Sequence, residues 1–344
     1  MAITIREVAE RAGVCASTVS LVLNKKPGIS EATRKRVEQT LKGLDYRPNV
    51  AAQTLVKRQI RTIGVIYSDH LQSGGVPSHF ALDVLDGIRS VSDASQANLL
   101  LVSVTEEFCD NHVGLHMMHQ DKLAGAILVA VDHDSPFFSV IKQSGLPFVD
   151  VNRRLDDNGA GYVVLDYVGA AVSGVEHLIE CGYEKIGLIV RETRPSIAAE
   201  LLSGYKSALK DREFREDWVG SHDATVEGGR AAMHKLLDAG IDAAFVSDNI
   251  AVRGALMAVA ERGLKVPEDV GIVGMDDYSQ EGQQDPPITS IRYPTVELGR
   301  TAVETLFRLM DNPSLAAQGS VIKTDLVTGQ TTGRRSRRGA QSQA

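Results

Sequence analysis

Several polar residues directly follow short apolar runs, and their types suit the binding of a small polar molecule. The runs are rich in Val, Ile, Leu and Ala, as buried strands are. Carboxylates accept hydrogen bonds from hydroxyl groups, and arginine donates several hydrogen bonds at once. Each acidic residue has an alternative role as a surface-loop charge or a helix cap. The residues selected by this position are Ser68, Asp69, Asp150, Asn152, Arg153, Arg194, Ser196, Asp248, Asn249 and Asp276.

Motifs of common enzyme classes are absent: there is no GxxxxGKS/T loop, no HExxH and no GxSxG. The adjacent Asp276 and Asp277 could in principle perform acid–base chemistry. His112, His116 and His119 are spaced so that one helical face would carry all three, as metal ligands would be. The alternative is an exposed polar face of that helix. We therefore expect no catalytic residues, no bound metal and no cofactor.

Apolar runs alternate with amphipathic helical segments from Thr62 onward. This alternation predicts an α/β fold with doubly wound parallel sheets and right-handed crossovers. A segment of roughly 270 residues is large for one such unit, so we expect two lobes. Ligands of these folds bind beyond the carboxyl ends of the strands. The predicted strands are Ile63–Tyr67, Leu99–Val104, Ala126–Ala130, Phe148–Val151, Tyr162–Leu165, Ile186–Val190, Ala244–Ser247 and Val270–Gly274.

The first 45 residues predict three short helices around a small core. Thr4 and Glu7 form a capping box, and Gly13 ends the first helix. A second helix covers Ala16–Leu23, and a third follows the cap Ser30. A helix, a glycine-containing turn and a second helix form a helix-turn-helix pattern. The predicted core residues are Ile5, Val8, Ala9, Ala12, Val19, Val22, Leu23, Val37, Leu41 and Leu44.

Residues 46–61 have the pattern of a hinge. Pro48 disfavours helix at Arg47, and Asn49 can cap a short helix that runs to about Val56. A helix of about two turns is not stable alone in water, so we expect this segment to be ordered only when docked.

Charge is distributed unevenly along the chain. Residues 1–61 hold 12 Lys and Arg against 5 Asp and Glu, whereas the remainder holds 25 against 39. A basic head on an acidic body indicates that only the head meets a polyanion such as DNA, and a solvated surface is the alternative.

Composition favours a cytoplasmic protein without a membrane span. The apolar fraction is 43%, and no apolar run reaches the roughly 18 residues that a spanning helix needs. The first residues lack the apolar stretch of a secretion signal. Cys15, Cys109 and Cys181 are widely spaced, as free thiols in a reducing compartment are.

Short motifs recur in the head, the hinge and the body. The head and hinge motifs are Ile5–Ala9, Ala12–Val14, Thr18–Ser20, Val22–Asn24, Thr33–Val37 and Leu44–Asn49. The body motifs are His177–Gly187, Val266–Asp277 and Pro287–Ile291. Together these motifs resemble those of the LacI/GalR family of bacterial transcription regulators. The resemblance implies a helix-turn-helix head, a hinge helix and a body similar to periplasmic sugar-binding proteins. It further implies a homodimer that binds a pseudo-palindromic, double-stranded DNA operator as a repressor.

The resemblance also implies domain boundaries, with the chain passing between lobes near Leu165, Ile291 and Ser320. The head is 1–47, and the hinge helix and linker are 48–61. The N-terminal lobe is 62–164 with 292–320, the C-terminal lobe is 165–291 with 321–333, and a basic disordered tail is 334–344.

In this family the start of the second helix lies in the major groove of DNA, which implies base contacts by Ala16, Ser17 and Leu21. Ser17 can donate or accept, whereas Ala16 and Leu21 can only make apolar contacts, and Leu21 has a partly buried core position as its alternative. Cys15 stands where the family usually has a Ser that caps this helix. Phosphate contacts are expected from residues that otherwise serve as caps or exposed filler: Thr4, Thr18, Ser20, Asn24, Ser30, Thr33 and Arg34.

The hinge adds Ala52 and Leu55 to the DNA-binding set. Leu55 is expected to insert into the minor groove and kink the duplex, or else to pack only on its dimer partner.

The resemblance also places an effector between the lobes and adds the aromatic Phe80 to the site. Carboxylates and arginine around an aromatic ring suit a sugar or related polyol. Three departures qualify this: Leu201 replaces a common Arg, Asp248–Asn249 replaces Asn–Asp, and His222–Asp223 stands where an aromatic is frequent. The loss of a guanidinium favours a less acidic ligand, or one with an amine. Both induction and corepression remain open.

Overall fold

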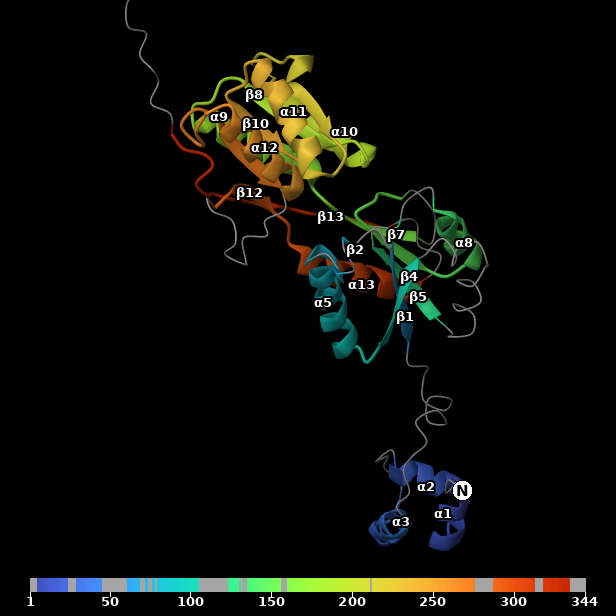
Figure 1. The fold of residues 1–344 in the computed structure, drawn as a ribbon. Coiled ribbons are helices and arrows are strands. Elements are labelled where there is room, and N and C mark those ends of the chain that lie inside the picture. Colours follow the sequence, from blue (N-terminus) through green and yellow to red (C-terminus); the bar gives the residue numbers. More distant parts are fainter. Residues whose placement is uncertain are drawn as a thin grey trace, which may run out of the picture. The chain divides into compact units, whose positions relative to one another are not determined.

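The computed structural model of the protein describes residues 5–23, 29–44, 61–68, 72–73, 76–77, 79–104, 123–129, 131, 135–155, 160–210, 212–275, 287–312 and 318–334 (Figure 1). The chain forms two compact units, Met1–Arg61 and Thr62–Ala344. Across these described ranges, no helix is both long and apolar enough to cross a membrane.

The first unit is a bundle of the helices α1 (Ile5–Ala12), α2 (Ala16–Leu23) and α3 (Glu31–Gly43). Gly13 has a φ of 61° between α1 and α2, a left-handed conformation that favours glycine. Ser30 caps α3, because its hydroxyl accepts a hydrogen bond from the backbone N–H of Thr33 at 3.3 Å. The predicted helix-turn-helix is thus confirmed, whereas the predicted cap Thr4 and hinge residues 46–60 lie outside the described residues. The residues buried at the centre of the bundle include Val8, Val19, Val22 and Val37.

The second unit contains two six-stranded sheets, here named sheet A and sheet C. Sheet A is parallel throughout, in the order β13-β7-β6-β5-β1-β4. Its strands are β1 (Thr62–Ser68), β4 (Asn98–Val104), β5 (Leu123–Val129), β6 (Phe148–Val151), β7 (Ala160–Leu165) and β13 (Gln318–Ile322). The short strands β2 (Gln72–Ser73) and β3 (Val76–Pro77) pair only with each other.

Helices cover both faces of sheet A, as a buried parallel sheet requires. Ile127 of β5 belongs to the same core as Leu298 of α13 (Thr295–Asp311), which packs against α5 (His79–Ala94). The next residue, Leu128, points to the opposite face and joins the core of Phe137 and Ile141 in α8 (Pro136–Ser144). The two-residue period of a strand therefore assigns successive side chains to different cores.

Sheet C has the order β14-β12-β11-β10-β8-β9, with β14 antiparallel to β12 and the other pairs parallel. Its strands are β8 (Ile186–Arg191), β9 (Val219–His222), β10 (Ala243–Val246), β11 (Gly271–Met275), β12 (Thr289–Arg292) and β14 (Asp325–Val327). Its helices are α9 (Tyr167–Glu180), α10 (Pro195–Ala208), α11 (Val226–Asp238) and α12 (Asn249–Glu261), with a 3-10 turn at Glu216–Trp218. The α/β fold with parallel sheets is confirmed.

At two described positions the predicted strands run beyond the observed ones, while several other strands are a few residues longer than predicted. Ser247 lies beyond β10, because the chain turns there toward the helix cap Asp248, although the Ser247 N–H still donates to the carbonyl of Ile189 at 2.9 Å. Val270 precedes β11 and is not part of the strand. The strands β9, β12, β13 and β14 were not predicted.

The chain passes between the sheets at three places. It leaves sheet A after Leu165, returns after Arg292, and leaves again through residues 323–324, which separate β13 from β14. The backbone N–H of Asp166 donates to the carbonyl of Ile322 at 2.9 Å, so the first and third passages are hydrogen-bonded to each other.

The segment after β14 is fixed to sheet C. The Thr331 hydroxyl donates to the carbonyl of Ile272 at 2.7 Å and accepts from the backbone N–H of Thr289 at 2.9 Å. Thr331 is fully buried, so both hydrogen bonds lie away from water.

Neighbouring helices approach each other closely through glycine. A Cβ atom on Gly299 of α13 would overlap the carbonyl oxygen of Val84 in α5, and one on Gly87 of α5 would overlap that of Val296 in α13. The pairs α9–α10 and α11–α12 have equivalent contacts at Gly204 and Gly254. Any larger residue would force the helices apart.

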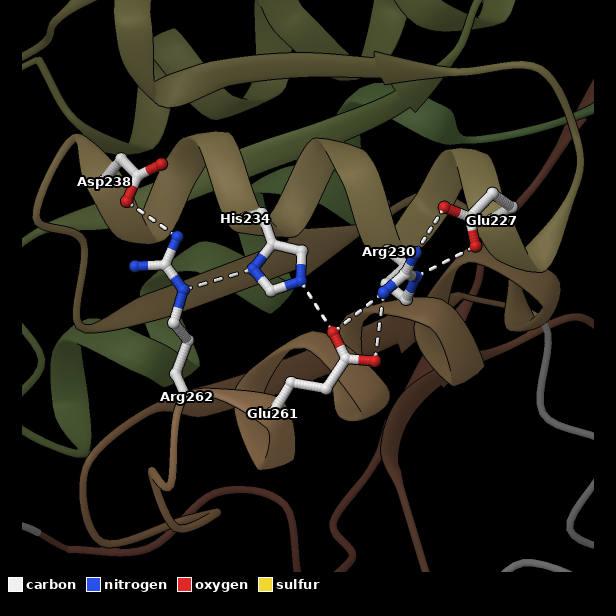
Figure 2. Close-up of polar contacts among 6 residues, drawn as sticks. All are labelled: Glu227, Arg230, His234, Asp238, Glu261 and Arg262. Atoms are coloured by element: carbon white, nitrogen blue, oxygen red, sulfur yellow. Dashed lines mark hydrogen bonds and ion pairs between the residues drawn. The ribbon is translucent and has the colours of Figure 1, made fainter.

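A network of charged side chains also joins α11 to α12 (Figure 2). Arg230 on α11 donates to both carboxylate oxygens of Glu261 on α12, at 3.0 and 2.9 Å. His234 Nε2 lies 2.8 Å from the same carboxylate, while its Nδ1 accepts from Arg262 Nε at 3.3 Å, which fits a neutral imidazole. The hydrogen bonds from His234 and Arg230 hold the pKa of Glu261 below its usual value. The full set is Glu227, Arg230, His234, Asp238, Glu261 and Arg262.

The glycine contact between α5 and α13 gives a stability prediction. Gly299→Ala should lower the free energy of unfolding by about 1–3 kcal/mol, because the added methyl group meets backbone rather than a movable side chain. Urea denaturation followed by circular dichroism measures this change. Gly220→Ala is the matched control, since its Cβ would meet Ala232 at an ordinary 3.5 Å. Equal midpoints for the two variants would contradict the packing argument.

Candidate DNA-binding and effector sites

Helix α2 buries one side and exposes the other. Val19 and Val22 are 0% and 4% exposed, whereas Leu21 between them is 36% exposed. Leu21 is not among the residues that form the core of the head, and its contact with a base stays a prediction. Ala16, Ser17 and Ser20 belong to the same helix.

Hydroxyl groups near the helix starts are already hydrogen-bonded within the head. The Thr18 hydroxyl lies 3.0 Å from the Cys15 sulfur, and the Thr18 N–H donates to the Cys15 carbonyl at 2.9 Å. The hydroxyls of Ser30 and Thr33 are 2.8 Å apart, and Arg34 donates its backbone N–H to the Ser30 carbonyl at 2.9 Å. Ser30 is therefore a helix cap, the alternative considered for it, and its role toward phosphate stays a prediction.

The carboxyl end of β6 places Asp150, Asn152 and Arg153 close together. Arg153 Nη2 donates to Asp150 Oδ2 at 2.5 Å, and Nη1 donates to the carbonyl of Val131 at 3.3 Å. The Arg153 guanidinium lies 4.2 Å from the centroid of the Phe138 ring, in a cation–π contact. The side chains of Arg153 and Asp150 are only 10% and 2% exposed.

Two atoms beside this ion pair are buried and have no hydrogen-bond partner among the residues that the structure describes: Asn152 Oδ1 and Arg153 Nε. Asn152 has a φ of 80°, a conformation that asparagine adopts more readily than most residues. An unsatisfied buried polar group costs about 1–3 kcal/mol.

The charge of Asp150 is finely balanced. Burial raises the pKa of the Asp150 carboxyl to about 7, even though the charge and hydrogen bond of Arg153 act in the opposite direction.

The carboxyl ends of β8, β9 and β10 bring together Arg191, His222 and Asp248. Arg191 Nε and His222 Nε2 lie 3.1 and 3.0 Å from the same carboxylate oxygen, Asp248 Oδ2. The other oxygen accepts from the backbone N–H of Ala251 at 2.9 Å and caps α12. His222 Nδ1 accepts from the backbone N–H of Ala224 at 3.1 Å, so Nε2 carries the proton and donates.

This arrangement stabilises the ionised form of Asp248. Burial acts to raise its pKa, but the hydrogen bond from His222, the charge of Arg191 and the backbone hydrogen bond from Ala251 outweigh burial and lower the pKa to about 2. The Asp248 carboxylate is thus occupied by protein groups. Arg191 is 22% exposed, and the Nη groups of its guanidinium have no partner within the described ranges.

The other predicted effector residues are spread over several elements. Phe80 in α5 is half-buried and packs against the core, while Arg194 and Ser196 are exposed where α10 begins. Ser68 ends β1 and Asn249 is the first residue of α12. Those outside the described residues are Asp69 and Asp276 of the effector set, Thr4, Asn24, Ala52 and Leu55 of the DNA-binding set, and Cys109, His112, His116, His119 and Asp277.

Two site residues were missed by the sequence analysis. Arg191 is the last residue of β8, so the rule that selected Asp150 beside a strand end could also have selected Arg191. His222 was noted only as a departure, because the polar strand β9 was not predicted. Leu201, which stands where the family commonly has Arg, is buried at 1% exposure, and Arg191 carries a guanidinium at the end of β8.

Within the described residues, no group of three or more His, Cys, Asp or Glu side chains could hold a metal ion. The two polar clusters consist of hydrogen-bond donors and acceptors at strand ends.

Comparison with known protein families gives two matches along the chain. Residues 4–49 match the model of bacterial regulatory proteins of the lacI family. Residues 175–332 match the model of the periplasmic binding protein-like domain.

Individual proteins match across nearly the whole chain. The HTH-type transcriptional regulator CelR of Thermobifida fusca is 31% identical over 330 residues, which are 94% of this chain and 96% of CelR. A solved complex of the transcriptional regulator CelR with cellobiose has a TM-score of 0.69 and 27% identity, covering 96% of this chain and 99% of that one. The lac repressor dimer bound to operator and the anti-inducer ONPF has a TM-score of 0.77 and 25% identity, covering 97% and 100%.

The hydrogen bonds around Asp248 predict a pH dependence of stability. Its folded pKa is about 2 against a usual 3.8, so the contribution to stability is present above pH 3.8 and is lost as the pH falls through about 2. The shift corresponds to about 2 kcal/mol at neutral pH. Asp248→Asn keeps a cap acceptor but removes the charge, so unfolding free energies from urea titrations should fall less steeply than wild type over this range. Asp238→Asn, at an exposed carboxylate, is the control. Parallel pH profiles for wild type and Asp248→Asn would refute this account.

Proposed function

The chain belongs to the LacI family of bacterial regulatory proteins. We propose that it represses transcription as a dimer, and that its affinity for a pseudo-palindromic operator depends on a bound sugar or related polyol. The observation that carries the proposal is that one chain joins a helix-turn-helix to two parallel sheets with polar clusters at their carboxyl ends. The head supplies DNA recognition and the sheets supply the effector site.

The recognition surface is the exposed side of α2. Val19 and Val22 hold the helix on the head, which leaves Leu21 to reach a base edge. An apolar side chain reads the methyl group of thymine by contact and cannot form a bidentate hydrogen bond to guanine. Ser17 supplies a hydrogen-bonding side chain on the same helix. Leu55 as a wedge in the minor groove, with Ala52 beside it, stays a prediction.

The effector site is proposed to lie beyond the carboxyl ends of sheets A and C. Asn152 Oδ1 and Arg153 Nε are a buried acceptor and a buried donor without partners in the described structure, and hydroxyl groups of a ligand can both donate and accept. At the carboxyl end of β8, Arg191 offers its Nη groups, while Asp248 is already engaged. The relatives' ligands are consistent with this chemistry, since CelR is found with cellobiose and the lac repressor with ONPF.

Catalysis is not part of the proposal. The relatives named above are transcriptional regulators, and we infer that this chain likewise binds its ligand without changing it. A regulator of this kind works where the chromosome lies, so we place it in the cytoplasm, associated with the nucleoid. We further infer two lobes, each built on one sheet, with the passages after Leu165, Arg292 and Ile322 as their boundaries.

Operator selection tests the proposed function directly. Purified full-length protein is incubated with random duplex DNA, bound duplexes are amplified and sequenced, and the selection is repeated with neutral sugars, sugar acids and amino sugars. An inverted repeat should emerge, and at least one sugar should change the affinity for it. Failure to enrich any inverted repeat, with or without sugars, would overturn the assignment.

Leu21→Ala separates base recognition from head stability. Because Leu21 is 36% exposed, the variant should keep its fold while losing preference at one base pair of the selected operator, by at most the roughly 1–3 kcal/mol that a mismatched base pair costs. Gel-shift titrations against single-base operator variants measure that preference. Val22→Ala is the control, since this buried residue should destabilise the head and weaken binding to all duplexes alike. If Leu21→Ala instead behaves like Val22→Ala, Leu21 is a core residue.

A further inference from the structure

One ion pair connects a loop of sheet A with a helix of sheet C. Arg154 lies three residues after the end of β6, and Glu200 lies in α10, which follows β8. Arg154 Nε donates to Glu200 Oε1 at 3.2 Å, and the side chains are 45% and 28% exposed. The contact spans elements of different sheets, whereas the pair Arg215–Asp217 joins neighbours in sequence.

The position of this pair relates it to the proposed effector site. Arg154 directly follows Asn152 and Arg153, whose unsatisfied atoms lie at the carboxyl end of sheet A. Glu200 is one helical turn after Ser196, which begins α10 at the carboxyl end of sheet C. A molecule held by both groups of residues would therefore lie next to the ion pair.

Tyr162 is the third member of this contact. Burial lowers the pKa of the Arg154 guanidinium, but hydrogen bonds with Glu200 and Tyr162 outweigh burial and raise it overall. Tyr162 lies on β7 beside Gly319 of β13, and a Cβ on Gly319 would overlap the Tyr162 ring. The ring thus occupies the space that glycine leaves, between two strands from which the chain crosses to sheet C.

The ion pair is only half formed. Glu200 Oε2 is buried and has no partner in the described part of the chain, although a carboxylate can accept a bidentate hydrogen bond from arginine. The Nη groups of Arg154 belong to the same guanidinium as the Nε that already donates to Glu200. A small relative movement of α10 and the loop after β6 would complete the pair, and a movement in the other direction would break it.

We propose that Arg154 and Glu200 form a latch between the two halves of the body. Whether this ion pair is formed or broken sets the equilibrium between the arrangement of the two halves that the effector prefers and the arrangement that the operator prefers. The coupling to operator rests on the proposed function, whereas the latch itself does not. Partly exposed ion pairs contribute little energy, so breaking the latch should shift the balance only about two- to fivefold.

A charge-swap cycle in the full-length protein tests the latch. The variants are Arg154→Glu, Glu200→Arg and the double swap Arg154→Glu/Glu200→Arg, with Arg215→Glu as a matched control that breaks an exposed pair within one segment. Spin labels at Ser139→Cys and Lys235→Cys, both exposed, report the distance between α8 and α11 in a background with the three native cysteines replaced by serine. Mixing with excess unlabelled protein gives dimers with one labelled subunit, so the measured distance is the one within a subunit.

The single reversals should move the label distances to longer and broader distributions, and the double swap should restore the wild-type distribution. Arg215→Glu should leave it unchanged. Identical distributions in all variants, or a swap that does not restore them, would overturn the latch. Glu200→Gln, which keeps size and shape, supplies the same test if a reversal does not fold.

Operator affinity tests the coupling. Single reversals should change the affinity for the selected operator about two- to fivefold, and the swap should restore it. Restored distances without any change in operator affinity would overturn the coupling but keep the latch. If no operator can be selected at all, the proposed function fails, while the distance measurement still decides the latch.

Discussion

Parallel pairing of strands is the constraint on which the rest of the body depends. Parallel strands need a helical connection between them, so each sheet carries helices on both faces and each helix must fit closely against the next. Glycines such as Gly299 provide that fit. The same pairing collects the carboxyl ends of the strands at one edge, where Asp150, Arg191 and His222 are found. The cluster of Arg191, His222 and Asp248 is therefore a product of the topology, whereas Asp150 and Arg153 are also close in sequence.

The two clusters show how different surroundings move the pKa values of two buried carboxylates in opposite directions. Asp150 is almost fully buried with a single charged partner, and its pKa rises to about 7. Asp248 is also largely buried, but Arg191, His222 and a backbone N–H all donate to it, and its pKa falls to about 2. The number of donors decides the outcome, because each one offsets part of the cost of removing charge from water. One cluster is left with unsatisfied atoms, while the other holds its carboxylate firmly.

Much of the fold can be predicted from the sequence, because buried strands are apolar throughout and helix caps have distinctive residues. The runs Ile63–Tyr67 and Ile186–Val190 are of this kind, and Ser30 is such a cap. The strands β9 and β13 escape prediction because both are short and contain glycine and polar residues. The partnership of Arg191 with Asp248 escapes it for a different reason: the two residues are far apart in the chain and meet only after β8 and β10 pair.

The order of the last strands has a consequence for how the chain is made. β13 forms one edge of sheet A and β14 one edge of sheet C, and both lie within residues 318–327. On the ribosome, these residues emerge only after all other described strands have been synthesised. Until then β7 and β12 present open backbone edges, which can pair with other chains. Both sheets are therefore completed only after residues 318–327 have emerged.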